Sequence, residues 1–381
     1  MKMKKITALL LAAVMVLALA ACGGGNAGSA PAASAPAASA PAASAPASSG
    51  SAPAAPAAPS ADDAAADAYH VDIIYSNVFN PAEWNYKAAE KFAEMVTERT
   101  EGHITVTYHG LNELDCYADS VVHAVNGDKW IGLEEPSLFA DYVGDCAVLV
   151  GPMLYNNDAE YNYVMDSDLV KGIKDRLAAE NIHILDTHYS FGYRSVVTNK
   201  DIRTPDDLKG VKLRSTTASL FIKTIEAMGA TPVPMSFTEC LSAISSGVVD
   251  GFEGSTSTLA GAGAPYELVK KVALTNHFIA TRWLFMPEDL YQEIPTKWRD
   301  ILDQCALECG EWEQKSCADD EQVQIDKMAK ENGVTWNEVD LDAFTKACDP
   351  VYDWMVTEYG ADPTLHQKLV DMISDFRAKN G

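Results

Sequence analysis

The chain alternates between strand-like and helix-like hydrophobic periods, beginning near residue 70. Residues 70–77 (HVDIIYSN) are rich in β-branched and aromatic side chains, which predicts a strand. An Asn-Pro-Ala-Glu start signal at 80–83 then opens a helical pattern that Gly102 ends. Residues 103–110 (HITVTYHG) alternate apolar and polar positions as a second strand. This strand–helix–strand order predicts a parallel sheet.

The same alternation recurs between residues 193 and 254, with clearer helix signals. A capping box at 236–239 (SFTE) begins one helix, and Gly247 ends it. The predicted elements of this segment are a strand at 193–199, a short helix at 204–210, a strand at 211–214, a helix at 217–228, a strand at 231–234, a helix at 236–247, and a strand and turn at 248–254.

Residues 295–332 predict one long helix, because they hold a single glycine and no proline after the first position. At about 1.5 Å per residue it would span about 55 Å, which exceeds one small domain, so we expect it to bridge two. Residues 334–340 (VTWNEVD) predict a strand, and the tail one or two helices. The fold class is therefore α/β with two domains, and a cleft is expected between them at the carboxyl ends of the strands.

The first part of the chain has a different composition. Three lysines, an apolar run at 6–20 and small residues before Cys22 are typical of a bacterial lipoprotein signal, with residues 1–21 removed and Cys22 lipidated. An ordinary signal peptide with an incidental cysteine is the alternative. Residues 22–67 are rich in Ala, Pro and Ser and predict a disordered tether. We therefore expect an extracytoplasmic protein that lipid on Cys22 anchors to a membrane, in the periplasm or on the outer face of the cytoplasmic membrane.

The net charge limits the partners. The chain has 54 acidic residues against 29 Lys and Arg, a formal charge of −25. Such a surface does not favour nucleic acid or anionic lipid. Seven cysteines follow Cys22, and an odd number argues against a complete disulfide framework. Cys305, Cys309 and Cys317 fit either a thiolate metal site or small buried apolar positions. We predict no metal and no cofactor.

Two arginines stand out against this acidic background. Arg194 and Arg214 each lie at one end of a short β-branched run, and the run of Arg214 hands over to a helix start. Arginine presents a planar fork that matches a carboxylate. The alternative for either is a surface residue that pairs with an acid, and we interpret Arg203 in that way. In an open cleft both groups would stay hydrated, so we expect their substitution to affect binding rather than stability.

The central segments of the chain resemble those of a known protein family. The segments GYRSVVTN, IRTPDDLKGVKLRS, GATPVPMSFTECLSAISSGVVDGFEG and TNHF resemble, in order and spacing, the solute receptors of tripartite ATP-independent periplasmic (TRAP) transporters. The resemblance covers about residues 70–375. It implies a periplasmic-binding-protein-like fold that closes on a small organic acid and delivers it to the TRAP membrane permease subunits.

The resemblance also implies domain bounds and site residues. Domain I comprises residues 68–191 and about 279–312, and domain II comprises 192–278 and about 313–381. Arg214 falls at the position of the carboxylate anchor, Arg194 lines the same pocket, and Phe237 packs on the ligand. Asn77 and Trp283 are further candidates for ligand contact.

The chain departs from the family pattern after VDG and in an early loop, which reads GLNELDCYADS where the family carries a glycine-rich polar turn. Many members carry an acid and then an asparagine after VDG, where this chain has Phe252, Glu253 and Gly254. We keep Glu253 as a candidate contact, and the missing amide at Gly254 predicts a bulkier or more apolar ligand than a four-carbon diacid. Glu134 is a candidate contact from the other domain, where it would have to receive a hydroxyl or an amine.

Three other classes of protein are alternatives to a TRAP receptor. An enzyme would need a catalytic motif, and the sequence has no G-x-S-x-G, H-E-x-x-H or Walker loop. The tether also fits an adhesin or a structural lipoprotein, but neither class accounts for the two strands that carry Arg194 and Arg214. A receptor for an ATP-driven importer shares the two-domain logic and is the strongest alternative.

Overall fold

The computed structural model describes residues 66–261 and 263–380, which belong to one compact unit. Cys22 and residues up to 65 of the predicted tether lie outside the described residues. The strands are β1 (Val71–Ser76), β2 (Ile104–His109), β3 (Trp130–Glu134), β4 (Ile182–Thr198), β5 (Lys212–Ser215), β6 (Thr231–Pro234), β7 (Gly251–Gly254), β8 (Lys271–Pro287) and β9 (Thr335–Asn337).

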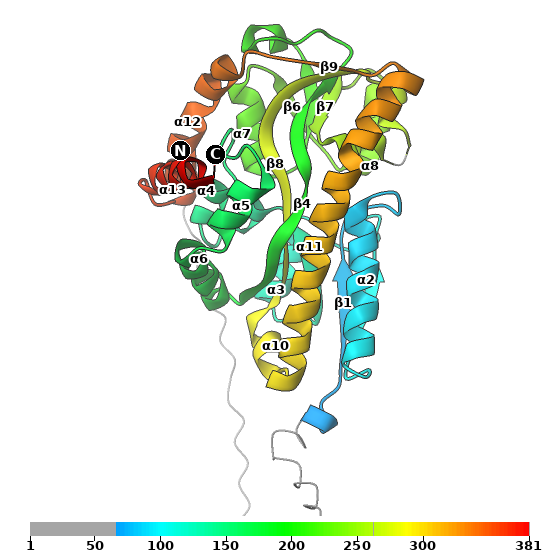
Figure 1. Ribbon diagram of the computed structural model, residues 1–381, viewed down its shortest axis with the longest axis vertical. Helices are drawn as coiled ribbons and strands as arrows, with labels where there is room; N and C mark the ends of the chain where they lie inside the picture. The colour runs from blue at the N-terminus through cyan, green and yellow to red at the C-terminus, as the bar shows by residue number, and fades with distance from the viewer. Residues whose placement is uncertain (1–65, 262, 381) are drawn as a thin grey trace, which may run out of the picture. The chain divides into compact units, whose positions relative to one another are not determined.

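These strands form one mixed sheet with the order β2-β1-β3-β8-β4-β7-β5-β6, and β9 pairs with β8. The pairs β1–β2 and β1–β3 at one end are parallel, as are β5–β6 and β5–β7 at the other. Between them, the long antiparallel pair β4–β8 runs through the whole sheet (Figure 1). The two parallel groups match the two predicted α/β halves, and the division into two domains stays a prediction.

The helices connect and cover these strands. They are α2 (Trp84–Arg99), α3 (Ala118–Val125), α4 (Asp145–Leu149), α5 (Asp158–Met165), α6 (Asp168–Ala179), α7 (Ser219–Ala227), α8 (Phe237–Ser245), α9 (Thr256–Ala260), α10 (Glu288–Glu293), α11 (Thr296–Lys327), α12 (Leu341–Tyr359) and α13 (Leu365–Asn380), with 3-10 turns at Pro136–Phe139, Pro205–Leu208 and Pro265–Glu267 and a π turn at Met328–Asn332. Among the described helices, none is both long and apolar enough to cross a membrane.

The long helix α11 confirms the prediction for residues 295–332. It contacts β4, α2 and α9, so it touches both early and central parts of the chain (Figure 1). Gly310 permits the close approach to β4, because a Cβ there would lie 2.1 Å from Oδ2 of Asp186. Glu313, one turn further along, accepts a hydrogen bond from the backbone N–H of Ser190 at 3.0 Å.

The first helix begins later than predicted. The start signal at 80–83 predicts a helix from Pro81, but α2 begins at Trp84. The reason is a local turn: the Asn80 side chain accepts from the N–H of Ala82 at 3.0 Å, and the Glu83 carboxylate accepts from the N–H of Asn80 at 3.0 Å. This turn holds residues 80–83 outside the helix, where they reach the cavity described next.

Candidate functional site

A cavity of about 320 Å³ lies beside the middle of the sheet. Its lining comes from the β1–α2 loop, from β4, β5 and β8, and from α8 and α9, and therefore from both predicted domains. The lining residues are Val78, Phe79, Asn80, Glu83, Leu111, Tyr117, Phe191, Arg194, Arg214, Thr216, Phe237, Thr238, Leu241, Thr258, Gly263 and Arg282. The structure thus brings together three of the predicted site residues: Arg194, Arg214 and Phe237.

Arg214 presents an open guanidinium fork to this cavity. It is only 2% exposed. Its Nε donates to the backbone oxygen of Met235 at 3.0 Å, and its guanidinium carbon lies 5.3 Å from the ring centre of Phe237. Among the described residues, neither terminal nitrogen of Arg214 makes a hydrogen bond. Burial lowers the pKa of Arg214 from its usual value, against the opposing effects of Tyr117 and Glu253. The group is therefore held by one contact and has two nitrogens free for a bidentate anion.

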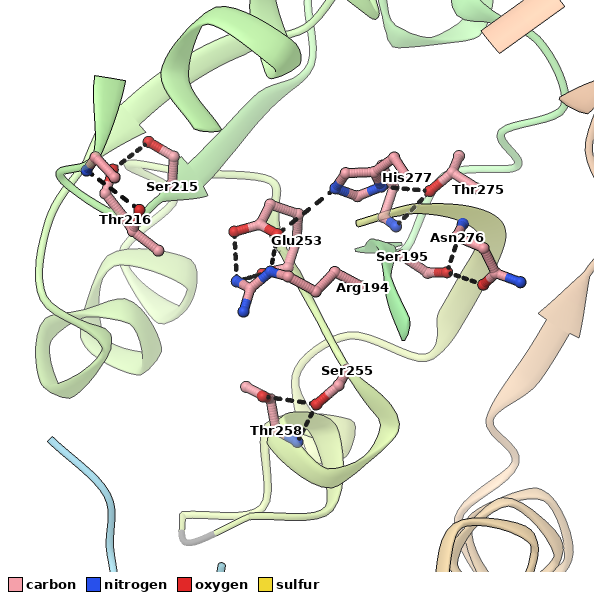
Figure 2. A network of polar contacts seen from close by, with 12 residues as sticks. Arg194, Ser195, Ser215, Thr216, Glu253, Ser255, Thr258, Thr275, Asn276 and His277 are labelled. Atoms are coloured by element: carbon pink, nitrogen blue, oxygen red, sulfur yellow. Dashed lines mark hydrogen bonds and ion pairs between the residues drawn. The ribbon is translucent and has the colours of Figure 1, made fainter. Parts of the chain in front are cut away.

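Arg194 is bound to Glu253 inside the protein. Its Nε and Nη2 lie 2.6 Å from the two carboxylate oxygens of Glu253, and Nη2 also donates to the Glu253 backbone oxygen at 3.2 Å (Figure 2). Arg194 is 4% exposed and Glu253 is fully buried. Burial raises the pKa of Glu253, but Arg194 and His277 more than offset this and hold it well below the usual range. Most of the charge of Arg194 is thus already balanced.

His277 lies behind this ion pair. Its Nδ1 is 2.8 Å from the hydroxyl of Thr275, and its Nε2 is 3.6 Å from Oε2 of Glu253 (Figure 2). Burial lowers the pKa of His277, and Glu253 opposes that shift. His277 supports Glu253 from behind, and it does not line the cavity.

Arg282 lines the cavity and was not predicted. It is 6% exposed, its Nη1 donates to the backbone oxygen of Thr281 at 2.7 Å, and its Nε has no partner among the described residues. The guanidinium lies over the rings of Phe79 and Phe191, at 5.4 and 5.2 Å. Burial and the neighbouring Arg194 lower the pKa of Arg282. A signal was present in the sequence: a charged residue inside the apolar run of β8 is seldom buried without a role.

Three carboxyl groups surround Arg282 without forming an ion pair with it in the described part of the chain. Burial raises the pKa of Glu83 to about 7 and that of Glu134 to about 7, although Arg282 opposes both shifts. Burial also raises the pKa of Glu135. Glu134 accepts from the N–H of Tyr117 at 2.7 Å. Glu83 and Glu134 are therefore poised between their neutral and charged forms near neutral pH.

Four predicted contacts do not line the cavity. Glu134 and Glu253 act from behind it, as described above. Asn77 accepts from the N–H of Phe79 at 3.1 Å and from the hydroxyl of Tyr108 at 2.8 Å, so it holds the loop that carries Phe79. The structure places Trp283 in the hydrophobic core, where its indole N–H donates to the hydroxyl of Tyr161 at 3.0 Å.

Gly254 does not open space in the ligand cavity. It lines a separate cavity of about 190 Å³, together with Tyr193, Trp336 and Glu321. A Cβ at Gly254 would lie 2.9 Å from the ring of Phe252, so the position itself is crowded. The premise that the missing amide enlarges the ligand site is wrong.

The cysteines contribute no chemistry to the site. All seven described cysteines are free and buried. Burial raises the pKa of Cys309 to about 12, which makes its thiol a poor nucleophile at neutral pH. Within residues 66–261 and 263–380, no group of three or more His, Cys, Asp or Glu is arranged to hold a metal ion.

Comparison with known proteins gives a consistent result. Residues 75–358 match the DctP family, described as bacterial extracellular solute-binding protein, family 7. A TRAP periplasmic solute-binding protein from Desulfovibrio salexigens, solved with diglycerolphosphate, is 34% identical and has a TM-score of 0.79, over 82% of this chain and 99% of that one.

Two further solved TRAP solute-binding proteins are similar. One from Fusobacterium nucleatum, with bound sn-glycerol-3-phosphate, is 30% identical with a TM-score of 0.78, over 81% of this chain and 98% of that one. Another from Actinobacillus succinogenes, with bound L-galactonate, is 26% identical with a TM-score of 0.74, over 80% of this chain and 100% of that one.

Proposed function

Because the chain belongs to the bacterial extracellular solute-binding proteins of family 7, we propose that its cavity binds a hydroxylated organic acid whose acidic group is held by Arg214. The protein is a TRAP solute receptor: it captures a small organic acid outside the cytoplasm and delivers it to the TRAP membrane subunits. What we propose here is the kind of acid that binds and the residues that hold it.

The open fork of Arg214 is the observation that carries this proposal. Of the three cavity arginines, Arg194 is already paired with Glu253, whereas Arg214 has two free nitrogens beside an aromatic ring. A buried guanidinium without a counter-charge is costly, so an acidic ligand that supplies the charge is bound strongly. Arg194 supports the same end of the ligand, and Phe237 packs on it. A cavity of about 320 Å³ is of the size that holds a small molecule.

The relatives' ligands favour a hydroxylated chain. Diglycerolphosphate, sn-glycerol-3-phosphate and L-galactonate each combine one acidic group with several hydroxyl groups. For this chain a carboxylate is our first choice for the acidic group, because a planar fork matches a planar carboxylate.

The anchoring of the protein belongs to the same proposal. Lipid on Cys22, at the end of the predicted tether, would hold the receptor close to its permease while leaving the folded part free to bind solute. The alternative readings as an enzyme or as a receptor of an ATP-driven importer are not favoured, because the family and the neighbours are solute receptors of TRAP systems.

A thermal-shift and calorimetry screen of the purified mature chain tests the proposal. The panel contains sugar acids, four-carbon diacids, keto acids, sn-glycerol-3-phosphate and neutral sugars. We expect at least one acid to bind, and at about 100 times its Kd it should add about 2.7 kcal/mol to the free energy of unfolding. Stabilisation by neutral sugars with none by any acid would overturn the proposal.

A further inference from the structure

Arg282 and Glu83 line the cavity at a distance from Arg214. In the sheet order β8-β4-β7-β5, Arg282 lies on β8 and Arg214 on β5, so two strands separate them. Three strand spacings amount to roughly 14 Å between their backbones. Arg282 also pairs with Tyr189 of β4, five residues before Arg194. The two arginines therefore approach the cavity from different ends.

The end at Arg282 offers both a donor and an acceptor. Arg282 is 6% exposed, and its Nε is unpartnered among the described residues. Glu83 uses its Oε2 to accept from the N–H of Asn80, while its Oε1 makes no hydrogen bond in the described part of the chain. Both side chains line the cavity. Arg282 is buried and Glu83 is partly buried, and a polar group shielded from water loses free energy when it has no partner.

We infer that Arg282 and Glu83 form a hydroxyl-recognising subsite, which selects acids that carry a hydroxyl group at the end remote from the acidic group. A hydroxyl oxygen accepts from the Arg282 guanidinium, and its hydrogen is donated to the free oxygen of Glu83. A methyl group at the same place leaves both side chains unpaired. A second carboxylate would pair with Arg282, but its negative charge would lie beside the carboxyl of Glu83, which is unfavourable. This inference rests on the proposed function and adds the residues that read the ligand's far end.

A purely structural role for Arg282 is the competing explanation. Glu134 and Glu135 lie near enough to affect its charge balance, and Phe79 and Phe191 cover its faces. A structural role predicts that substitution weakens every ligand equally or lowers stability. Recognition of a hydroxyl predicts that substitution changes the ratio of the affinities for the hydroxylated ligand and its deoxy partner. A loss of stability alone does not change that ratio.

Matched ligand pairs test the inference. L-galactonate and L-fuconate differ only in the terminal hydroxyl, as do glycerate and lactate, and as do sn-glycerol-3-phosphate and 1,2-propanediol 1-phosphate. Galactarate carries a second carboxylate in place of the terminal CH2OH group of galactonate. We expect the hydroxylated member of whichever pair binds to bind roughly ten- to a hundredfold more tightly than its deoxy partner, and more tightly than the diacid.

Two variants then test whether Arg282 and Glu83 cause the preference for the hydroxylated ligand. Arg282→Met and Glu83→Met should each bring the ratio of affinities close to one, mainly by weakening the hydroxylated ligand, while the deoxy ligand still binds. Binding of the deoxy ligand shows that the variant is folded, and Glu83→Met covers the case in which Arg282→Met is not.

The outcomes separate the inference from the proposed function. Equal affinity for both members of every pair that binds, or tighter binding of the diacid, overturns the inference and leaves the receptor role in place. A ratio unchanged in both variants also overturns it. If no acid binds at all, the proposed function fails, and the inference fails with it.

Discussion

The three cavity arginines differ in what already binds them. Arg194 faces Glu253, Arg282 faces aromatic rings and a backbone oxygen, and Arg214 has one backbone contact and an open fork. Sequence motifs correctly brought Arg194 and Arg214 to one cavity, although only Arg214 lies near the end of its strand and Arg194 lies inside β4. They did not show which arginine was already neutralised, because that depends on Glu253 in a strand more than fifty residues away.

The placement of Trp283 shows a second limit of sequence reasoning. Trp283 was predicted to contact the ligand, yet its neighbour Arg282 lines the cavity while Trp283 enters the core. Successive residues of a strand face opposite sides, so an error of one position reverses the assignment. The last family motif, TNHF, ends at Phe278 inside β8, so no motif covers Arg282 or Trp283. The charge of Arg282 inside the apolar run was the signal that could have marked the side facing the cavity.

The Arg194–Glu253 pair changes our expectation for stability. From the sequence we expected hydrated arginines whose loss leaves the empty protein unchanged, but this pair is buried. Arg194→Met leaves Glu253 as a buried unpaired charge, so we expect a loss of about 3–5 kcal/mol in the free energy of unfolding. The double variant Arg194→Met/Glu253→Met should recover most of it. Urea unfolding without ligand measures both, and equal stability of the single and double variants would contradict a charge-pairing role.

At the scale of elements, the sequence predicted the type of most segments but misjudged some of their bounds. The strand predicted at 193–199 is the last part of the much longer β4, whose pairing with β8 is interrupted by several register shifts. Register shifts interrupt the alternation of apolar and polar positions along β4, so only its last residues, 193–199, showed a recognisable strand pattern. Ahead of α2, the turn at 80–83 competes successfully with helix formation, because the Asn80 side chain accepts from the N–H of Ala82 and the Glu83 carboxylate accepts from the N–H of Asn80.

The contact between α11 and β4 contains a buried acid whose titration we expect to affect stability. The pKa of Glu313 is raised to about 8, because burial and Asp158 raise it more than Cys317, Ser190 and Arg282 lower it. In the unfolded chain a glutamate titrates near 4.5. Between these two pH values the folded protein retains a proton that the unfolded chain has lost. Stability at this site is therefore fully present below about pH 4.5 and falls as the pH rises towards 8.

Glu313→Gln tests this linkage. Glutamine can still accept from the N–H of Ser190 but has no charge to bury. We expect the variant to be more stable than the parent by about 1–3 kcal/mol near pH 8 and to differ little near pH 5. Chemical unfolding at the two pH values measures the difference, with the exposed Glu311→Gln on the same helix as control. The same gain at both pH values would show that ionisation is not the cause.

At the scale of the whole molecule, the prediction of a lipid anchor is independent of the cavity. If Cys22 is lipidated, Cys22→Ala should leave the precursor unprocessed or release the protein from the membrane fraction, because no acyl chain can be attached. Ligand affinity of the purified protein should not change. Membrane fractionation with metabolic labelling by a fatty acid measures this, and a labelled, membrane-held Cys22→Ala protein would disprove the assignment.

We propose that the receptor function of the whole molecule depends on Arg214 as the anchor of the acid, and calorimetric titration of Arg214→Lys tests this most directly. Lysine keeps the charge and loses the planar fork, so we expect about 2–4 kcal/mol of binding free energy to be lost, roughly a thirty- to thousandfold drop in affinity. Arg203→Lys, at an exposed position whose guanidinium contacts Glu338, is the matched control and should bind normally. Near-normal affinity in Arg214→Lys would mean that the acid is held elsewhere.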